Sequence, residues 1–241
     1  MFRSLKTFIE NISHSRVHST MSSSKYLHNV DVATEKATFG MGCFWSCDSL
    51  YGATLGVIRT RVGYSGGKNK EVSYRNIGDH TEVIEIDFDP TVITYDKLLD
   101  LFWNNHEYGL LTKIKRQYMS LILYHNEAQK EIAEKSFKDQ AKKLNAELIT
   151  EIKPAGVFHP AEDYHQKYRL QGHSEFMLSL GLKPGEMLQT SHLAARLNGY
   201  LVGQGGENQF LMEAESLGLN KEEQNYVLKY LKKYEGGGLF C

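Results

Sequence analysis

The sequence ATFGMGCFWSCDSLY, at residues 37–51, is the stretch from which we predict the fold. Ala37, Phe39 and Met41 alternate with other residues, so their side chains share one face, as on a short strand. A helix-like stretch follows and begins at Cys43. A strand that turns into a helix here predicts that Cys43 lies at or near the N-terminus of the helix.

Strands and helices alternate along the next hundred residues. We expect further strands over residues 57–64, 82–89, 118–124 and 147–154. Thr94 can cap one helix between them, and a longer helix should face inward through Ala128, Ile132, Ala133, Phe137 and Ala141. Strands separated by helices, with antiparallel connections between some of them, predict an α/β or α+β two-layer sandwich with a mixed sheet.

After about residue 181 the pattern changes to helices only. Leu193, Leu197 and Leu201 mark one helix, and Asn220 with Glu223 resembles a capping box that opens the last one. We therefore divide the chain into three parts. They are an N-terminal segment (1–36), a catalytic domain (37–180) and a C-terminal helical extension (181–241) whose glycine-rich tail reads EGGGLFC.

Composition excludes several classes of protein. Hydrophobic residues make up 41% and charged residues 24% of the 241 residues, and the net charge is -1. These values are ordinary for a soluble domain and give no field that would attract nucleic acid or a membrane. No apolar run reaches the roughly 18 residues of a transmembrane helix, and no large apolar stripe argues against a monomer. Three cysteines without a CxxC pair favour a reactive thiol over a disulfide framework or a zinc site.

The first 25 residues are basic and rich in serine, with a single acid, Glu10. This composition is typical of a mitochondrial presequence, because a secretory signal would need a continuous apolar stretch. A disordered N-terminus is an equal alternative. Met21 could serve as an internal start, so we expect a cytoplasmic or mitochondrial protein, or both.

Cys43 is the candidate nucleophile. The helix N-terminus favours thiolate over thiol, and the thiolate is the reactive form. A buried structural cysteine is the alternative. Phe44 and Trp45 follow directly and could line an apolar pocket, although such a pair more often packs in a core.

Glu82 is the candidate proton donor. On the strand 82–89 it points to the same side as Ile84, Ile86 and Phe88. Partial burial would keep its carboxyl group protonated near neutral pH, so that it could protonate a leaving oxygen. The alternative is a carboxylate at the strand end that simply reaches water.

Other polar side chains are less specific. Tyr74 and Tyr118 could hold a polar oxygen, but the chain has 14 tyrosines and any one is more often structural. The histidines show no metal-binding spacing. We expect His125 and His165 on ordinary surfaces or at helix caps.

Several motifs occur in an order that resembles the A-class methionine sulfoxide reductases. They are GCFW at 42–45, VGYSGG at 62–67, DHTEV at 79–83, DP at 89–90, LFWNNH at 101–106, QYMS at 117–120 and AEDYHQ at 161–166. The resemblance covers roughly residues 37–170. GCFW alone would be weak, but the ordered set is specific.

The resemblance implies a fold, a mechanism and partners. The family's fold is a two-layer sandwich related to ferredoxin-like topologies, and no metal or organic cofactor is needed. Cys43 would attack the sulfur of a methionine S-sulfoxide, free or in a protein, while Glu82 protonates its oxygen. Tyr74 and Tyr118 would bind that oxygen, and Phe44 with Trp45 would hold the methyl group. Cys43 then becomes a sulfenic acid, a second cysteine forms a disulfide with it, and thioredoxin restores the thiols. Dithiothreitol can replace thioredoxin in the test tube, and the enzyme repairs oxidised proteins.

Two cysteines compete for the resolving role. Cys241 ends the glycine-rich tail, as resolving cysteines do in the family. As a flexible chain, the seven residues after Tyr234 reach about 15 Å. Cys47 lies one helical turn after Cys43, but sulfurs at that spacing are often too far apart for an unstrained bridge. The family usually has a small residue at that position. We favour Cys241 as the resolving cysteine and Cys47 as a structural or auxiliary thiol.

The family's substrate-binding Asp has no counterpart in the loop LLTKIKRQY, and Asp48, Glu107 or a water could replace it. Two other functions stay open. One is a cysteine hydrolase or transferase that pairs Cys43 with a histidine such as His80. The other is a redox sensor that forms a Cys43–Cys241 disulfide without turnover.

Overall fold

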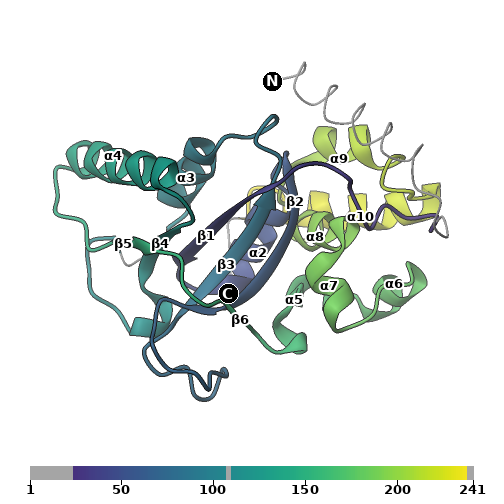
Figure 1. Ribbon diagram of the computed structural model, residues 1–241. Coiled ribbons are helices and arrows are strands. Elements are labelled where there is room, and N and C mark those ends of the chain that lie inside the picture. Colours follow the sequence, from purple (N-terminus) through teal and green to yellow (C-terminus); the bar gives the residue numbers. More distant parts are fainter. Residues whose placement is uncertain (1–23, 107–109, 238–241) are drawn as a thin grey trace.

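The computed structural model describes residues 24–106 and 110–237 (Figure 1). Several predictions fall outside these residues. They concern Glu107, Cys241, Met21 and most of the presequence-like segment.

The centre of the fold is a six-stranded sheet with the strand order β5-β4-β1-β3-β2-β6. Its strands are β1 (Glu35–Met41), β2 (Val57–Ser65), β3 (Thr81–Phe88), β4 (Ser120–Tyr124), β5 (Glu151–Pro154) and β6 (His159–Pro160). The four central strands are antiparallel, and β5 joins β4 in parallel. The order β4-β1-β3-β2 is the ferredoxin-like arrangement. The predicted mixed α/β fold is therefore confirmed.

One face of the sheet carries the main core. The helices that pack there are α2 (Phe44–Gly52), α3 (Tyr95–Asn104) and α4 (Glu127–Leu144). Phe39, Ile84, Ile86, Leu98 and Phe102 are wholly buried between sheet and helices. The even-numbered side chains of β3 point into this core, so Glu82 points toward the same side.

Three details of the predicted elements are wrong. The last predicted strand starts at Glu151 and not at residue 147. Tyr118 does not begin a strand, because residues Arg116–Tyr118 form a 3₁₀ turn (η1) and β4 starts at Ser120. Ala128 is exposed, because Gln129 takes the inward position at the start of α4. The Gln129 side chain donates to the Lys36 carbonyl at 2.7 Å, and this bond sets the rotation of the first turn.

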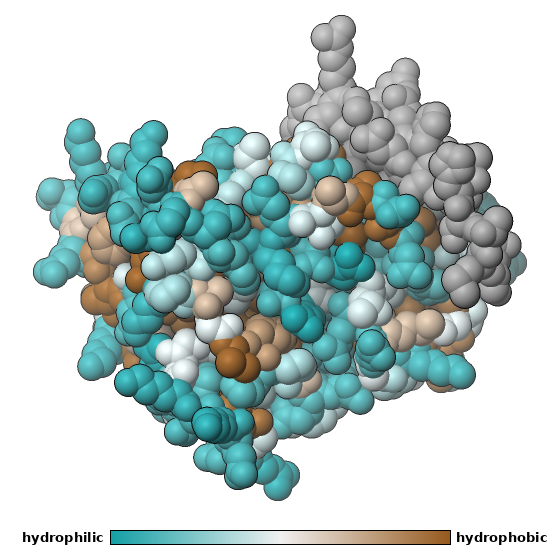
Figure 2. Space-filling model, in the orientation of Figure 1, coloured by the Kyte–Doolittle hydropathy of each residue, from teal (hydrophilic) through white to brown (hydrophobic). Residues whose placement is uncertain are grey.

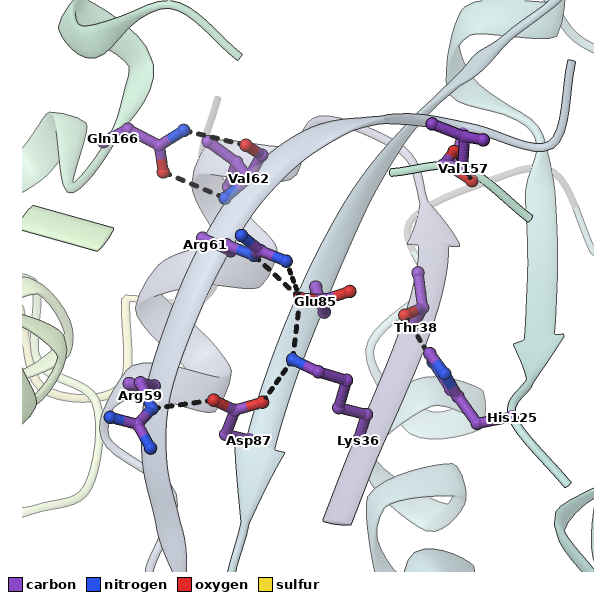
Figure 3. A network of polar contacts seen from close by, with 11 residues as sticks. Lys36, Thr38, Arg59, Arg61, Val62, Glu85, Asp87, His125, Val157 and Gln166 are labelled. Carbon is purple, nitrogen blue, oxygen red and sulfur yellow. Dashed lines mark hydrogen bonds and ion pairs between the residues drawn. The ribbon is translucent and has the colours of Figure 1, made fainter. Parts of the chain in front are cut away.

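The opposite face of the sheet is polar over β1, β2 and β3. Lys36 bonds Glu85 at 3.0 Å and Asp87 at 2.7 Å, while Arg61 and Arg59 bond the same two carboxylates at 2.7 Å (Figure 3). Viewed from this side, the surface is mostly hydrophilic, with small separate hydrophobic patches (Figure 2). The charges satisfy one another, and the apolar part of this face is a small cluster of Val83, Leu121 and Leu123.

Between the sheet and residue 237, six α-helices follow. They are α5 (Tyr168–Gln171), α6 (Ser174–Ser179), α7 (Glu186–Thr190), α8 (His192–Tyr200), α9 (Glu207–Glu213) and α10 (Lys221–Tyr234). The predicted capping box is present at α10: Asn220 accepts from the Glu223 N–H, and Glu223 accepts from the Asn220 N–H. Helical structure starts at α5, before the predicted boundary at residue 181. Among residues 24–106 and 110–237, no helix is long and apolar enough to cross a bilayer.

The extension packs against the sheet and against α2. Its helices share a second core with Ile58 of β2 and with Leu27 and Val30, which precede the sheet. His192 donates to the Ile58 carbonyl at 2.6 Å. Arg196, which is fully buried, donates to the Gly52 carbonyl at 3.0 Å. The extension is thus attached directly to the helix that carries Cys43 at its N-terminus.

Candidate active site

Cys43 is the N-cap residue of α2, with backbone angles φ −63° and ψ 122°. Gly42 has φ +97°, which favours glycine, and this turn leads β1 directly into α2. The Cys43 side chain is half-buried. Its predicted position at a helix N-terminus is confirmed, and the backbone N–H groups and helix dipole there favour a thiolate.

Glu82 lies beside this helix start and is only 2% exposed. One carboxyl oxygen accepts from the backbone N–H of Phe44 at 3.2 Å. The other accepts from the side-chain amide of Gln117 at 2.6 Å. The carboxyl group is therefore buried next to Cys43, as the strand parity predicted. Gln117 is a site residue that sequence reasoning missed, although it lies in the QYMS motif.

Tyr118 and Tyr74 complete the polar side of the site. The two hydroxyl groups share a hydrogen bond. Burial raises the pKa of Tyr118 well above its usual value, and the nearby charges of Glu82 and Cys43 raise it further. Tyr118 thus lies close to Glu82 and Cys43, Tyr74 is joined to it, and the Tyr118 hydroxyl stays protonated as a donor.

An aromatic cluster forms the apolar side of the site. The Phe44 ring, which is buried, lies 5.1 Å from the His165 ring and 5.9 Å from the Tyr64 ring, measured between centroids. Trp45 is stacked on Tyr168 at 3.8 Å with an angle of 6° between the rings. This aromatic cluster begins directly after Cys43, at the first turn of α2.

His165 is not on an ordinary surface, so that prediction was wrong. It is 2% exposed, and its Nδ1 accepts from the Trp45 indole N–H at 3.1 Å. Since an indole nitrogen only donates, the His165 ring proton is on Nε2. Burial lowers the pKa of His165 and outweighs the opposite effect of Glu162. The neutral ring therefore holds the Trp45 side chain in place.

Glu162 connects the cluster to the Tyr74 loop. It accepts from the Tyr64 hydroxyl at 2.8 Å and from the Tyr74 backbone N–H at 2.9 Å. Burial would raise the pKa of Glu162, but these donors hold it below its usual value. Glu162 is thus an ionised anchor for the segment that carries Tyr74.

Gln166 and Lys167, the two residues after His165, hold residues 161–168 against β2 and α2 through buried polar contacts. The Gln166 amide bonds both the N–H and the carbonyl of Val62, at 3.0 and 2.8 Å (Figure 3). Lys167, fully buried with φ +52°, donates to the Thr60 carbonyl at 2.6 Å and lies 3.1 Å from the Asp48 carboxylate. Asp48 is therefore a buried structural partner and does not replace the loop acid of the family.

Cys47 is buried on the core side of α2. Its thiol donates to the Cys43 backbone carbonyl at 3.3 Å. This contact with the backbone one turn earlier agrees with a structural thiol.

His80 does not act on Cys43. Its Nδ1 accepts from the Gly67 N–H at 3.3 Å, and its Nε2 donates to the Asn69 carbonyl at 2.9 Å. Both ring nitrogens therefore hold the loop before β3, so His80 is not available as the base of the hydrolase interpretation. In the part of the chain that the structure describes, no group of acidic, Cys and His side chains could hold a metal ion.

Comparison with known proteins identifies close relatives. Residues 35–192 match the family described as peptide methionine sulfoxide reductase. A Drosophila melanogaster protein of that name is 56% identical over 216 residues, covering 89% of this chain and 87% of the relative. Peptide methionine sulfoxide reductase A5 of Oryza sativa subsp. japonica is 41% identical over 174 residues, covering 70% and 68%.

Solved structures agree with this result. Reduced Mxr1 from Saccharomyces cerevisiae has a TM-score of 0.54 and 27% identity, covering 64% of this chain and 93% of Mxr1. Methionine sulfoxide reductase A of Corynebacterium diphtheriae has a TM-score of 0.50 and 31% identity, covering 58% and 76%. The motifs, the fold and these relatives lead to one assignment: the chain belongs to the peptide methionine sulfoxide reductase family, a family of oxidoreductases.

Proposed function

We propose that this protein reduces methionine S-sulfoxide, free or in proteins, with Cys43 as nucleophile and Glu82 as proton donor. The observation that carries the proposal is the position of Glu82. Its buried carboxyl group bonds the first N–H of the helix that Cys43 caps. A nucleophile and an acid therefore face one volume, bounded by the hydroxyl groups of Tyr74 and Tyr118 and by the rings of Phe44 and Trp45.

The reaction follows from these positions. The Cys43 thiolate attacks the sulfoxide sulfur, and the oxygen, held by Tyr74 and Tyr118, takes a proton from Glu82. Oxygen passes to the Cys43 sulfur, so that methionine leaves and Cys43 becomes a sulfenic acid. The methionine sulfur gains two electrons and the cysteine sulfur loses two. The methyl group rests between Phe44 and Trp45, which orients the sulfoxide for attack.

A second thiol must then reduce the sulfenic acid. We assign this step to Cys241: its thiol attacks the Cys43 sulfenic acid, water leaves and a disulfide forms. Thioredoxin, as the external dithiol, reduces that disulfide. The burial of Cys47 and its contact with the Cys43 carbonyl support Cys241 over Cys47. The protein acts as a monomer on this proposal.

An activity assay with the two epimers tests the proposal. The purified protein is incubated with methionine S-sulfoxide or R-sulfoxide and dithiothreitol, and methionine is quantified. We expect turnover of the S epimer only, with none in Cys43→Ser and near-normal turnover in Cys47→Ser. No methionine from either epimer would contradict the proposal. One equivalent without further turnover would favour a redox sensor.

A comparison of the two reductants tests which cysteine resolves the sulfenic acid. Cys241→Ser should keep activity with dithiothreitol and lose it with thioredoxin. If Cys47→Ser shows that pattern instead, Cys47 resolves the sulfenic acid.

We also propose cytoplasmic or mitochondrial localisation, or both, which rests on the basic, serine-rich composition of residues 1–25. A reporter fused to these residues tests it. A reporter that stays in the cytoplasm would remove the mitochondrial form.

A further inference from the structure

A groove runs along the extension beside the active site. It has a volume of about 510 Å³ and lies between α2, α5 and the C-terminal ends of α8 and α10. The side chains that line it include Ser46, Tyr164, Tyr168, Val202 and Tyr234. Tyr164, Tyr168 and Tyr234 are 56%, 40% and 40% exposed. Three exposed aromatic rings around one hollow are typical of a surface that binds an apolar segment.

One end of the groove lies at the active site. Ser46 is in the first turn of α2, three residues after the N-cap Cys43, so the groove begins within one helical turn of Cys43. Tyr168 contributes to the groove and also stacks on Trp45. A segment in the groove would therefore lead toward the Cys43 thiol.

The other end lies where the described chain leaves α10. Tyr234 is the last residue of α10, and the Gly237 N–H donates to its carbonyl at 3.0 Å, which closes a turn. Gly203, with φ +84°, lets the backbone of Tyr234 pack directly on it, since any side chain at 203 would overlap that backbone. The end of α10 is thus fixed at the groove, and residues 238–241 continue from this point.

We infer that this groove is the docking site of the chain's own residues 238–241, with Leu239 and Phe240 packed against its aromatic rings. Leu239 and Phe240 are the apolar side chains that directly precede Cys241. Four residues span at most about 14 Å when extended, which matches a short path along one groove. Docking would raise the local concentration of the Cys241 thiol at the Cys43 sulfenic acid. The inference rests on the proposed function and explains what the helical extension contributes.

The experiment separates the two chemical steps in the full-length protein. Reduced protein is mixed with one equivalent of methionine S-sulfoxide and no reductant. Samples taken over time are treated with a dimedone-type probe, which traps sulfenic acid. Mass spectrometry then gives the methionine released, the trapped Cys43 and the disulfide. The unaltered chain and Cys241→Ser define the short and long lifetimes of the sulfenic acid.

Two variants test the docking. In Leu239→Ser/Phe240→Ser we expect methionine release at the normal rate and a sulfenic acid that persists about tenfold longer or more, the effect of losing two apolar contacts. Leu178→Ser is the control, because Leu178 is 56% exposed and does not line the groove. It should change neither step.

Substitutions at two glycines test whether the packing of Tyr234 on Gly203 holds the end of α10 at the groove. Gly203→Ala should displace the end of α10 and lengthen the sulfenic acid lifetime. Gly181→Ala is the matched control, because Gly181 also has a positive φ, +72°, but nothing lies within 4 Å of an added Cβ. The control should match the unaltered chain.

The outcomes are distinct. If the unaltered chain releases no methionine, the proposed function fails. If Leu239→Ser/Phe240→Ser and Gly203→Ala release methionine and resolve the sulfenic acid normally, the docking inference is wrong. If Val202→Asp raises KM for an oxidised peptide but not for free methionine sulfoxide, and the sulfenic acid lifetime is unchanged, the groove binds substrate peptide and the inference is overturned.

Discussion

The Lys167 ammonium group lies 3.1 Å from the Asp48 carboxylate, and neither side chain is exposed to solvent. The pair joins α2 to the segment that presents His165 and Tyr168 to the active site. Asp48 also accepts from the Thr60 hydroxyl at 2.6 Å and from the Lys167 backbone N–H at 3.1 Å. Burial lowers the pKa of Lys167, and Asp48 opposes this change. The Asp48 carboxylate is thus the polar centre that fixes this segment on the helix.

Loss of both partners should lower the free energy of unfolding by less than the sum of the two single losses. Lys167→Met leaves a buried carboxylate without its cation, and we expect a loss of about 3–5 kcal/mol in the free energy of unfolding. Asp48→Asn/Lys167→Met removes both charges and should lose less than the sum of the single variants. Urea unfolding measures these values. Lys153→Met, which removes a surface lysine paired with Glu151, should cost less than about 1 kcal/mol. Additive losses in the double variant would contradict a coupled pair.

Sequence patterns within a single strand or helix correctly predicted the features that lie on that one strand or helix. Alternation along β3 placed Glu82 toward the core, and the strand-to-helix turn placed Cys43 at the start of α2. The Asn220–Glu223 capping box needed only its own four residues. The burial of Gln129 in place of Ala128 was missed because it depends on the Lys36 carbonyl, 93 residues away.

The contacts that organise the site join distant segments, so periodicity could not find them. Trp45 and His165 are 120 residues apart, and Asp48 and Lys167 are 119 apart. The AEDYHQ motif was the signal that pointed to His165, but its ring contacts depend on how residues 161–168 pack on α2. The positions of Glu82 and Cys43 are now given by the structure, whereas their roles stay predictions until the assays are done.

Protonation of His165 should be visible at Trp45. Because the pKa of His165 is lowered, the neutral ring is present at pH 7 and protonates below its usual value of 6.5. Protonation places a hydrogen on the Nδ1 that accepts from Trp45, so the stability from this bond is complete above pH 6.5 and lost as pH falls. In a Trp103→Phe background, Trp45 fluorescence should change below pH 6.5. His165→Asn, which keeps an acceptor without titrating, should show no such change. An identical titration in both proteins would exclude His165 as its source.

The contact between α2 and α8 should tolerate no added methyl group. A Cβ on Gly199 would lie 2.5 Å from the Ala53 Cβ and would overlap the Ser49 carbonyl. We expect Gly199→Ala to lower the free energy of unfolding by about 1–3 kcal/mol. Gly156→Ala, where nothing lies within 4 Å, should have little effect. Thermal unfolding of both variants checks this, and equal melting temperatures would mean that the two helices do not need this close approach.

Glu82→Gln should show whether the reaction needs the acidic proton of Glu82 or only its hydrogen bonds. The amide oxygen can still accept from the Phe44 N–H, and its nitrogen can donate to the Gln117 oxygen once that amide turns over, but it cannot give a proton to the sulfoxide oxygen. Methionine release in a single turnover should fall by about 10²–10⁴-fold, the usual contribution of a general acid. Glu85→Gln is the matched control on the same strand, where the side chain points to the opposite face and pairs with Lys36. It should release methionine at the normal rate. If Glu82→Gln does so as well, the proton comes from another donor, and Tyr118, whose hydroxyl group stays protonated beside Cys43, would be the next residue to test.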